Sequence, residues 1–139
     1  MTGSCVCGAV SVSLKTKPEF IHECNCGLCR KAGAGWGYFS SSEVTTTGET
    51  SLFERKDKCP PSATLHFCKT CGTTTHFTPS QAYLRENPSA NHVGVNMKLF
   101  APSDLDGIEV RYPNGAGWSG EGGFEYRRDA ITISVDTPY

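Results

Sequence analysis

The chain has 139 residues, with 13 basic and 14 acidic side chains and a formal net charge of -1. This length fits one domain spanning residues 1–139, and the balanced charge, with no run of more than two basic residues, disfavours a nucleic-acid partner. No apolar stretch approaches the roughly 20 residues of a membrane-spanning helix, so we expect no membrane partner. The sequence sets no oligomeric state.

Short alternating segments, punctuated by 15 glycines and 8 prolines, predict a mainly β fold with few helices. In the first expected strand Val10, Val12 and Leu14 alternate with serines, and a second strand is expected at residues 20–23. Enrichment in β-branched residues supports further strands along the chain. These are expected at residues 37–41, 51–55, 64–67, 73–78, 92–96, 109–112 and 131–135.

Helical turns are expected only at residues 28–32 and 102–105, where the second begins with a proline suited to a helix start. The glycine-rich stretch at residues 112–124 contains the turn signal Pro113-Asn114-Gly115. It predicts a loop or hairpin that could form the rim of a site.

The cysteines carry the strongest functional signal in the sequence. Seven of the eight fall into three clusters, which are Cys5-Val6-Cys7, Cys24-Asn25-Cys26-Gly27-Leu28-Cys29 and Cys68-Lys69-Thr70-Cys71. In an extended chain residues i and i+2 point to the same side, so Cys5 and Cys7 can bind one ion together. The Cys68 and Cys71 turn supplies the complementary half. We therefore predict a structural zinc held by four thiolates that ties the first strand to the middle of the chain.

The middle cluster has no such partner. Cys24, Cys26 and Cys29 can supply three thiolates to a second zinc from one short loop. Zinc with three protein ligands keeps a position open for water or substrate, which is the arrangement that catalysis requires. The sequence thus predicts one closed site and one open site.

A disulfide framework is the alternative interpretation of an even cysteine count in a short chain. Closely spaced CxC and CxxC pairs are poor disulfide scaffolds and good chelators, so we favour metal binding. The residues before Cys5 contain no charged segment followed by an apolar one, as a secretory signal would. We therefore expect a cytoplasmic location, where thiols stay reduced.

Taken in order, the motifs resemble a known family. They are Gly3-Ser4-Cys5-Val6-Cys7-Gly8-Ala9-Val10, the CxCxxC cluster followed by Arg30-Lys31 and Gly33, Phe67-Cys68-Lys69-Thr70-Cys71-Gly72, and Val95-Asn96. This set is similar to the glutathione-dependent formaldehyde-activating enzyme (GFA) family, whose domain is shared with centromere protein V. The resemblance covers roughly residues 3 to 105, and three cysteine clusters in fixed order make it specific.

The resemblance implies a fold of packed antiparallel sheets, often called a β-tent, stapled by zinc. It implies a structural zinc at Cys5, Cys7, Cys68 and Cys71, and a second zinc at Cys24, Cys26 and Cys29. It also implies a carbon-sulfur lyase run in reverse, which joins a thiol such as glutathione to formaldehyde. Metal binding deprotonates a thiol at neutral pH, so an open zinc suits this chemistry.

Two residues near the open cluster are candidates for catalytic roles. His22 lies two residues before Cys24, and it could shuttle a proton, act as a fourth ligand, or be a partly buried histidine bonded to backbone. Asn25 stands where relatives commonly carry histidine or another ring, and it can still form hydrogen bonds around the metal.

Four further residues are candidates for substrate contacts. Arg30 and Lys31 could bind a carboxylate of a peptide substrate or could be solvated surface cations. Trp36 could wall a pocket beside the second zinc or belong to the core. Asn96 is placed near the ligand pocket by the resemblance, and a strand-end turn residue is the alternative.

Two other functional classes remain open from the sequence. A zinc-stabilised binding module would use both metals only to hold the fold, with the fourth position of the second zinc closed. A redox repair enzyme would need a nucleophilic cysteine outside both clusters, and only Cys59 qualifies, with Lys56 and Lys58 nearby to lower its pKa.

Overall fold

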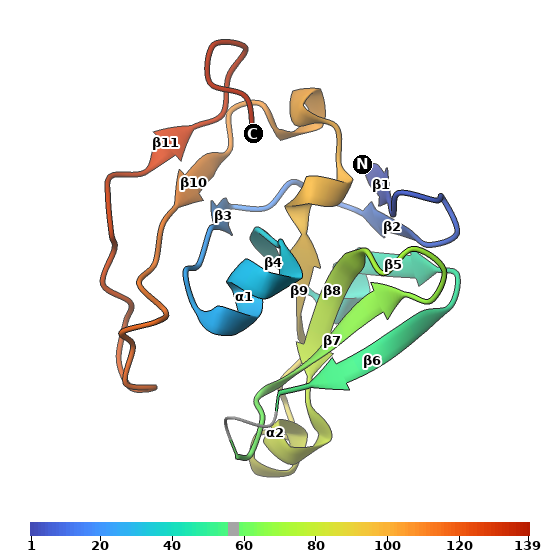
Figure 1. The fold of residues 1–139 in the computed structure, drawn as a ribbon, viewed down its shortest axis with the longest axis vertical. Coiled ribbons are helices and arrows are strands. Elements are labelled where there is room, and N and C mark those ends of the chain that lie inside the picture. Colours follow the sequence, from blue (N-terminus) through green and yellow to red (C-terminus); the bar gives the residue numbers. More distant parts are fainter. Residues whose placement is uncertain (56–58) are drawn as a thin grey trace.

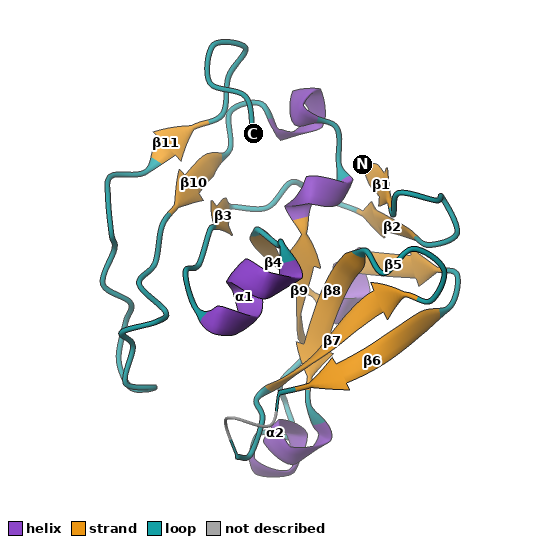
Figure 2. Ribbon diagram, viewed as in Figure 1, coloured by secondary structure: helices purple, strands orange, loops and turns teal. Residues whose placement is uncertain are grey.

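The computed structural model describes residues 1–55 and 59–139. Within them the chain forms two β-sheets, two short α-helices and three short 3-10 helices (Figures 1 and 2). The strands are β1 Thr2–Ser4, β2 Ser11–Leu14, β3 Phe20–His22, β4 Trp36–Ser40, β5 Val44–Thr47, β6 Thr50–Glu54, β7 Ala63–Cys68, β8 Thr74–Pro79, β9 His92–Asn96, β10 Glu109–Arg111 and β11 Ile131–Thr132. The helices are α1 Gly27–Ala32 and α2 Gln81–Glu86, and the 3-10 helices are Ser41–Glu43, Met97–Leu99 and Pro102–Leu105.

The smaller sheet has the order β1-β2-β5, and the larger has the order β11-β10-β3-β4-β9-β8-β7-β6. The predicted mainly β fold is confirmed. Neighbouring strands are antiparallel, with the exception of β3 and β10, which run parallel. The long connection from β9, containing two 3-10 helices, carries the chain back so that β10 enters in the direction of β3, as a parallel pair requires.

Most of the expected strands lie where the alternating pattern put them, with ends shifted by a residue or two. The strand at residues 92–96 and the helical turn at residues 102–105 match the structure. The last expected strand ends early, at Thr132, and is followed by a turn in which the Thr137 amide donates to the Ser134 carbonyl (3.1 Å). Helix α2 and strands β1 and β5 were not expected from the sequence, and β5 offers only one apolar residue followed by three threonines.

The expectation of an extended strand through Cys5 and Cys7 is wrong. These residues lie in the turn between β1 and β2, where the Gly8 amide donates to the Cys5 carbonyl (3.0 Å). Gly8 has a φ of 76°, a conformation that glycine adopts without steric cost. The two cysteines are therefore brought together by a tight turn, and the cluster joins turns of both sheets instead of clamping a strand.

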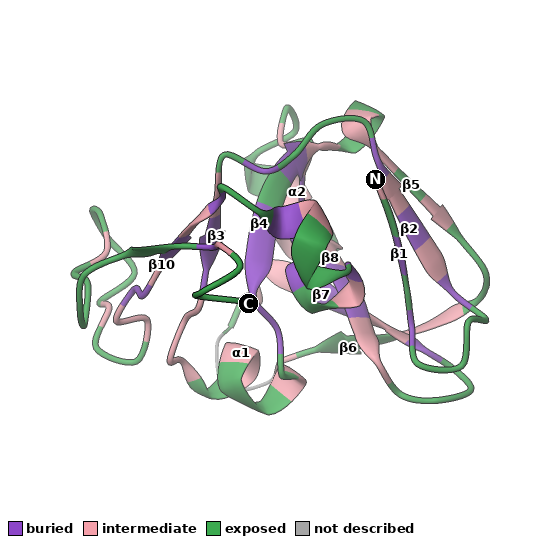
Figure 3. Ribbon diagram, turned by 90° about the horizontal axis from the view of Figure 1, so that it is seen from above, coloured by how far each residue is buried: buried purple, intermediate pink, exposed green. Residues whose placement is uncertain are grey.

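The main core lies between the two sheets and the connection that follows β9. Figure 3 shows burial concentrated along β4 in the middle of the molecule, while α1 and the outer loops are largely exposed. Fully buried side chains at its centre include Val12, Ile21, Met97, Leu105 and Val110. Each contributes roughly 1.5–3 kcal/mol by leaving water. None of the helices in residues 1–55 and 59–139 is long and apolar enough to cross a membrane.

Candidate functional site

Four cysteines from two hairpin turns converge at the edge of the larger sheet. The sulfurs of Cys5, Cys7, Cys68 and Cys71 all lie within 4.8 Å of one another. The Cys5 and Cys7 sulfurs are 3.5 Å apart, and those of Cys7 and Cys68 are 3.7 Å apart. Sulfurs around a tetrahedral zinc lie roughly 3.8 Å apart, so the set has the spacing of a closed zinc site.

Backbone amides donate hydrogen bonds to two sulfurs of this cluster. The Val10 amide donates to the Cys5 sulfur (3.2 Å), and the Thr70 amide donates to the Cys68 sulfur (3.4 Å). Hydrogen bonds from the Thr73 hydroxyl and amide lower the pKa of Cys71 to about 5. Such bonds to ligand sulfurs favour the deprotonated form that binds metal.

The second cluster is built around the start of α1. The sulfurs of Cys24, Cys26 and Cys29 lie within 4.8 Å of one another, with Cys26 and Cys29 at 3.3 Å. Cys26 is the N-cap of the helix, and its sulfur accepts a hydrogen bond from the Cys29 amide (3.4 Å). The helix ends at Gly33, which adopts a φ of 63°. A short helix with these two caps thus holds the three sulfurs on one side.

Each sulfur of this cluster accepts a hydrogen bond. The Cys24 sulfur accepts from the Cys26 amide (3.4 Å), and the Cys29 sulfur accepts from the indole nitrogen of Trp36 (3.2 Å). Hydrogen bonds with Cys24 and Cys29 lower the pKa of Cys26 to about 2, and hydrogen bonds with Cys24 and Cys26 raise the pKa of Cys29. A divalent cation replaces protons held in this way, so the donor set fits a metal ion.

The three-cysteine cluster opens into a cavity of about 280 Å³. Among the described residues no histidine or carboxylate joins the three sulfurs as a fourth ligand. Cys24 and Cys29 line the cavity beside three cations and one acid, which are Arg30, Lys98, Arg127 and Glu23. The excess of positive charge makes the cavity suitable for an anionic ligand.

Glu23 organises the far wall of this cavity. Its carboxylate lies 3.0 Å from the Lys98 ammonium and accepts a hydrogen bond from the Tyr139 hydroxyl (2.8 Å). Its carbonyl accepts from the Arg127 guanidinium (2.7 Å). Burial, reinforced by Glu23, raises the pKa of Tyr139 above its usual value, so the hydroxyl stays a donor. The wall therefore links Glu23, which follows strand β3, to Arg127 and to Tyr139 in the C-terminal part of the chain.

The glycine-rich loop forms the rim of the site. The Asn25 amide donates to the Asn114 side chain (2.8 Å), and the Asn25 carbonyl oxygen accepts from the Ala116 amide (2.9 Å). Between these contacts Gly115 lies so close to Cys24 that an added Cβ would be 2.3 Å from the sulfur. Asn25 thus fastens the loop over the cysteines, and the expected loop or hairpin at residues 112–124 is found there.

His22 lies outside the sulfur cluster in an aromatic cage. The side chain is buried, and its Nδ1 is 3.1 Å from the Tyr38 hydroxyl. Rings of Phe20, Tyr38, Phe124 and Tyr126 surround it, and Nε2 has no hydrogen-bond partner among the described residues. Burial, with a smaller effect of Arg111, lowers the pKa of His22 to about 4. The ring is therefore neutral at pH 7.

The four residues expected to contact substrate lie in different places in the structure. Arg30 lines the cavity, whereas Lys31 lines a different groove on the other side of α1. Trp36 is buried beneath the cluster and contacts it through its indole nitrogen. Asn96 is also buried, and its amide bonds the backbone of Gly35 (3.3 Å), Lys98 (3.2 Å) and Thr74 (2.9 Å). This placement makes Asn96 a support for the cavity wall.

Cys59 is exposed and belongs to neither cluster. Lys56 and Lys58, which the redox alternative invokes, lie outside the described residues. Sequence reasoning missed Glu23, Lys98 and Arg127, which come together from three distant parts of the chain. Only the turn signal at residues 113–115 indicated that a loop would reach the site.

The chain is a mainly β domain with one four-cysteine cluster and one three-cysteine cluster, each of which could hold a metal ion. The sequence model of the family described as glutathione-dependent formaldehyde-activating enzyme matches residues 1–102, and the chain belongs to this family. The structure is similar to the crystal structure of a Rhodobacter sphaeroides protein, with 28% sequence identity and a TM-score of 0.57 over 78% of this chain and 97% of that chain. No curated protein matches the sequence.

Proposed function

We propose that this protein is a zinc-dependent enzyme that adds a thiol such as glutathione to formaldehyde or a related small electrophile. The reaction is that of a carbon-sulfur lyase run in reverse. One observation carries the proposal: a cluster of three cysteine sulfurs borders, through Cys24 and Cys29, a cavity that three cations line. Membership of the GFA family supports the same chemistry. The free thiols fit a cytoplasmic location.

In this proposal Cys24, Cys26 and Cys29 hold the second zinc, and Cys5, Cys7, Cys68 and Cys71 hold the structural one. Bound at the open cluster, zinc supplies a site at which a substrate thiol loses its proton at neutral pH. Three thiolates leave a net charge of about -1 on such a site. Arg30, Lys98 and Arg127 offset that charge and attract the carboxylates of an anionic thiol.

The overall reaction is redox-neutral. The sulfur forms a bond to the aldehyde carbon, the carbon-oxygen π bond breaks, and the oxygen takes the proton that the thiol released. Glu23 is placed to bind the ammonium group of a peptide substrate, since its carboxylate faces the cavity with Lys98. The neutral, caged ring of His22 favours a positioning role over proton transfer.

The test has two parts. Metal analysis of the reduced protein should give two zinc ions per chain, and one in Cys26→Ser. Formation of the adduct from ¹³C-formaldehyde and glutathione, followed by NMR, should be faster than the uncatalysed reaction with wild type and with Cys59→Ser. It should fall to the uncatalysed rate with Cys26→Ser.

Other outcomes would favour the other classes. Two zinc ions without any rate enhancement would indicate a binding module. Loss of activity in Cys59→Ser, with Cys26→Ser unaffected, would indicate a redox repair enzyme instead.

A further inference from the structure

A second cavity, of about 310 Å³, adjoins the cysteine cavity across its far wall, and we call it the outer cavity. The two cavities share three lining residues, which are Glu23, Lys98 and Arg127. The other residues that line the outer cavity all follow strand β10 along the chain, and they are Tyr112, Arg128, Ile131, Pro138 and Tyr139. A ligand of the cysteine cavity can therefore extend over the wall into this second space.

Arg128 is held at the outer cavity by Tyr112. The Arg127 amide donates to the Tyr112 carbonyl (2.9 Å), which keeps the two segments side by side. The Arg128 guanidinium lies over the Tyr112 ring, with its central carbon 3.6 Å from the ring centroid. Stacking on the ring restricts the orientation of the guanidinium, so less rotamer freedom is lost when it binds an anion.

The outer cavity carries positive charge that no acid compensates. Glu23 is the one acid among the described residues that line it, and its carboxylate is paired with Lys98 (3.0 Å). Arg127 donates to the uncharged carbonyl of Glu23, and in residues 1–55 and 59–139 no carboxylate forms an ion pair with Arg127 or Arg128. Asp129 borders a neighbouring hollow together with Arg128, without an ion pair between them. Two guanidinium groups are thus available to an anionic ligand.

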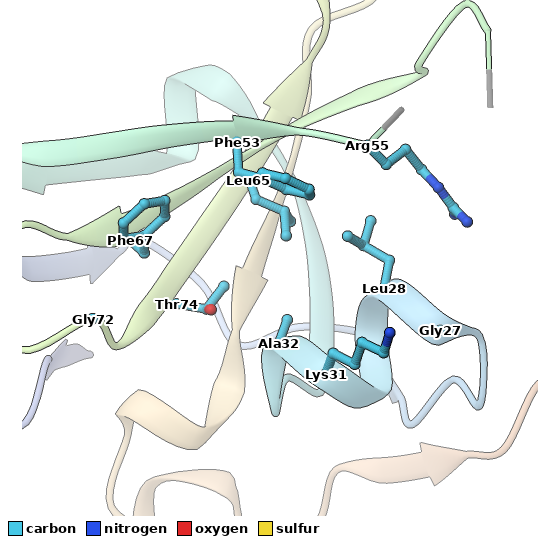
Figure 4. Close-up of a pocket in the computed structure, with 10 residues that line it drawn as sticks. All are labelled: Gly27, Leu28, Lys31, Ala32, Phe53, Arg55, Leu65, Phe67, Gly72 and Thr74. Carbon is cyan, nitrogen blue, oxygen red and sulfur yellow. The ribbon is translucent and has the colours of Figure 1, made fainter. Parts of the chain in front are cut away.

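The cysteine cavity by itself is small for a ligand site. Its volume of about 280 Å³ lies just below the range of about 300–1,000 Å³ that is usual for small-molecule sites. The groove on the other side of α1 offers no extension, because it shares no lining residue with the cysteine cavity. Figure 4 shows that this groove is lined mainly by apolar side chains, such as Phe53, Leu65 and Phe67. The outer cavity is the neighbouring space that suits a charged arm.

We propose that the outer cavity binds an anionic group at the far end of the thiol substrate, and that Arg128 is a specificity-determining residue. The inference rests on the proposed function, because it takes the ligand of the cysteine cavity to be a thiol. With the sulfur at the cysteine cluster, the arm of the substrate crosses the wall, and its carboxylate or phosphate accepts hydrogen bonds from Arg128. A guanidinium presents paired N–H donors that match the oxygens of either group. Thiols with an anionic arm are therefore preferred over short or neutral thiols.

Two matched pairs of thiols test the charge of the arm. Glutathione and its diethyl ester differ in their carboxylates, and phosphopantetheine and pantetheine differ in a phosphate. With Co²⁺ in the second site, the change in thiolate charge-transfer absorption on adding each thiol gives its Kd. Arg128→Gln should raise the Kd of the anionic member of at least one pair two- to fivefold, and leave its partner without the anion unchanged. The pair that responds identifies the anion.

Two further variants serve as controls. Arg85, an exposed arginine in the last turn of α2, is the matched surface cation, and Arg85→Gln should change none of the four Kd values. Arg128→Lys keeps the charge but loses the paired donors, so it should restore part of the affinity that Arg128→Gln loses.

Rates of adduct formation with ¹³C-formaldehyde separate this inference from the proposed function. Arg128→Gln should raise KM for the responding thiol and leave kcat unchanged, because Arg128 binds an arm away from the reacting atoms. If the reaction is accelerated but Arg128→Gln and Arg85→Gln behave alike with all four thiols, the inference is overturned and the proposed function stands. If the Kd values respond as expected and no rate is enhanced, the proposed function fails and the outer cavity keeps its role in binding. The inference is also overturned if none of the thiols changes the Co²⁺ spectrum.

Discussion

Replacing Gly115 with alanine tests whether the glycine-rich loop is fitted to the open cysteine cluster. The added Cβ would be 2.3 Å from the Cys24 sulfur and 3.3 Å from the Cys26 Cβ, whereas ordinary contacts begin at 3.4 Å. The loop must therefore retreat by about 1 Å, because the sulfur is held by the amide of Cys26.

That retreat lengthens both hydrogen bonds of Asn25, to Asn114 (2.8 Å) and from Ala116 (2.9 Å). Each is worth about 0.5–1.5 kcal/mol, so Gly115→Ala should destabilise the protein by about 1–3 kcal/mol. For a domain of this size the melting temperature should fall by roughly 3–10 °C. Affinity for metal at the second site should fall with it, since the sulfur of Cys24 is displaced.

Gly123→Ala is the matched control, because an added Cβ there meets nothing within 4 Å. Melting curves of both variants, and titration of the second site with Co²⁺ followed by its thiolate charge-transfer absorption, provide the measurements. If Gly115→Ala has the same melting temperature and the same affinity for Co²⁺ as Gly123→Ala, the close fit of loop and cluster is refuted.

Three further predictions concern groups around the sulfurs and the sheet. Trp36→Phe keeps an aromatic ring but removes the hydrogen bond to Cys29, so affinity of the second site for Co²⁺ should fall by roughly three- to tenfold, with the structural site unchanged. Lys98→Gln should raise KM for glutathione two- to fivefold without changing kcat, and the rate with the neutral thiol 2-mercaptoethanol should stay the same. Burial, reinforced by His66, lowers the pKa of His76 to about 4. Between pH 6.5 and 4 this imidazole is therefore protonated in the unfolded chain and neutral in the folded protein. The free energy of unfolding should therefore fall between pH 6.5 and 4 by up to about 3 kcal/mol more in wild type than in His76→Gln, as measured by urea denaturation; parallel pH profiles would contradict this.

The grouping of the cysteines could be read from the sequence because ligand spacing is local. Cys68 and Cys71 sit on one turn, and Cys26 and Cys29 lie one helical turn apart, so neither pair depends on the rest of the fold. The conformation around Cys5 and Cys7 could not be read in this way. A CxC pair can converge on a metal from an extended strand or from a tight turn. Here the positive φ of Gly8 allows the turn.

The cavity depends on contacts that no local pattern encodes. Asn25 and Ala116 are 91 positions apart in sequence, and Glu23 and Tyr139 are 116 apart. Both contacts follow from the parallel pairing of β10 with β3, which brings the C-terminal segment beside the cysteines. Strand pairing over such distances is set by packing of the whole core, so the rim and the cationic wall were not predicted.

The parallel pairing of β3 and β10 has a consequence for how the family can diversify. The region that the family model matches ends at residue 102, before β10 begins, and it contains all seven cysteines of the two clusters. The rim at Gly115, Arg127 and the hydroxyl of Tyr139 all come from the remainder. The rim over the three cysteines and one cation of the cavity wall thus come from a different length of chain than the sulfurs and the other lining residues. Under the proposed function, a change in residues 103–139 can alter which thiol fits while leaving the three sulfurs in place.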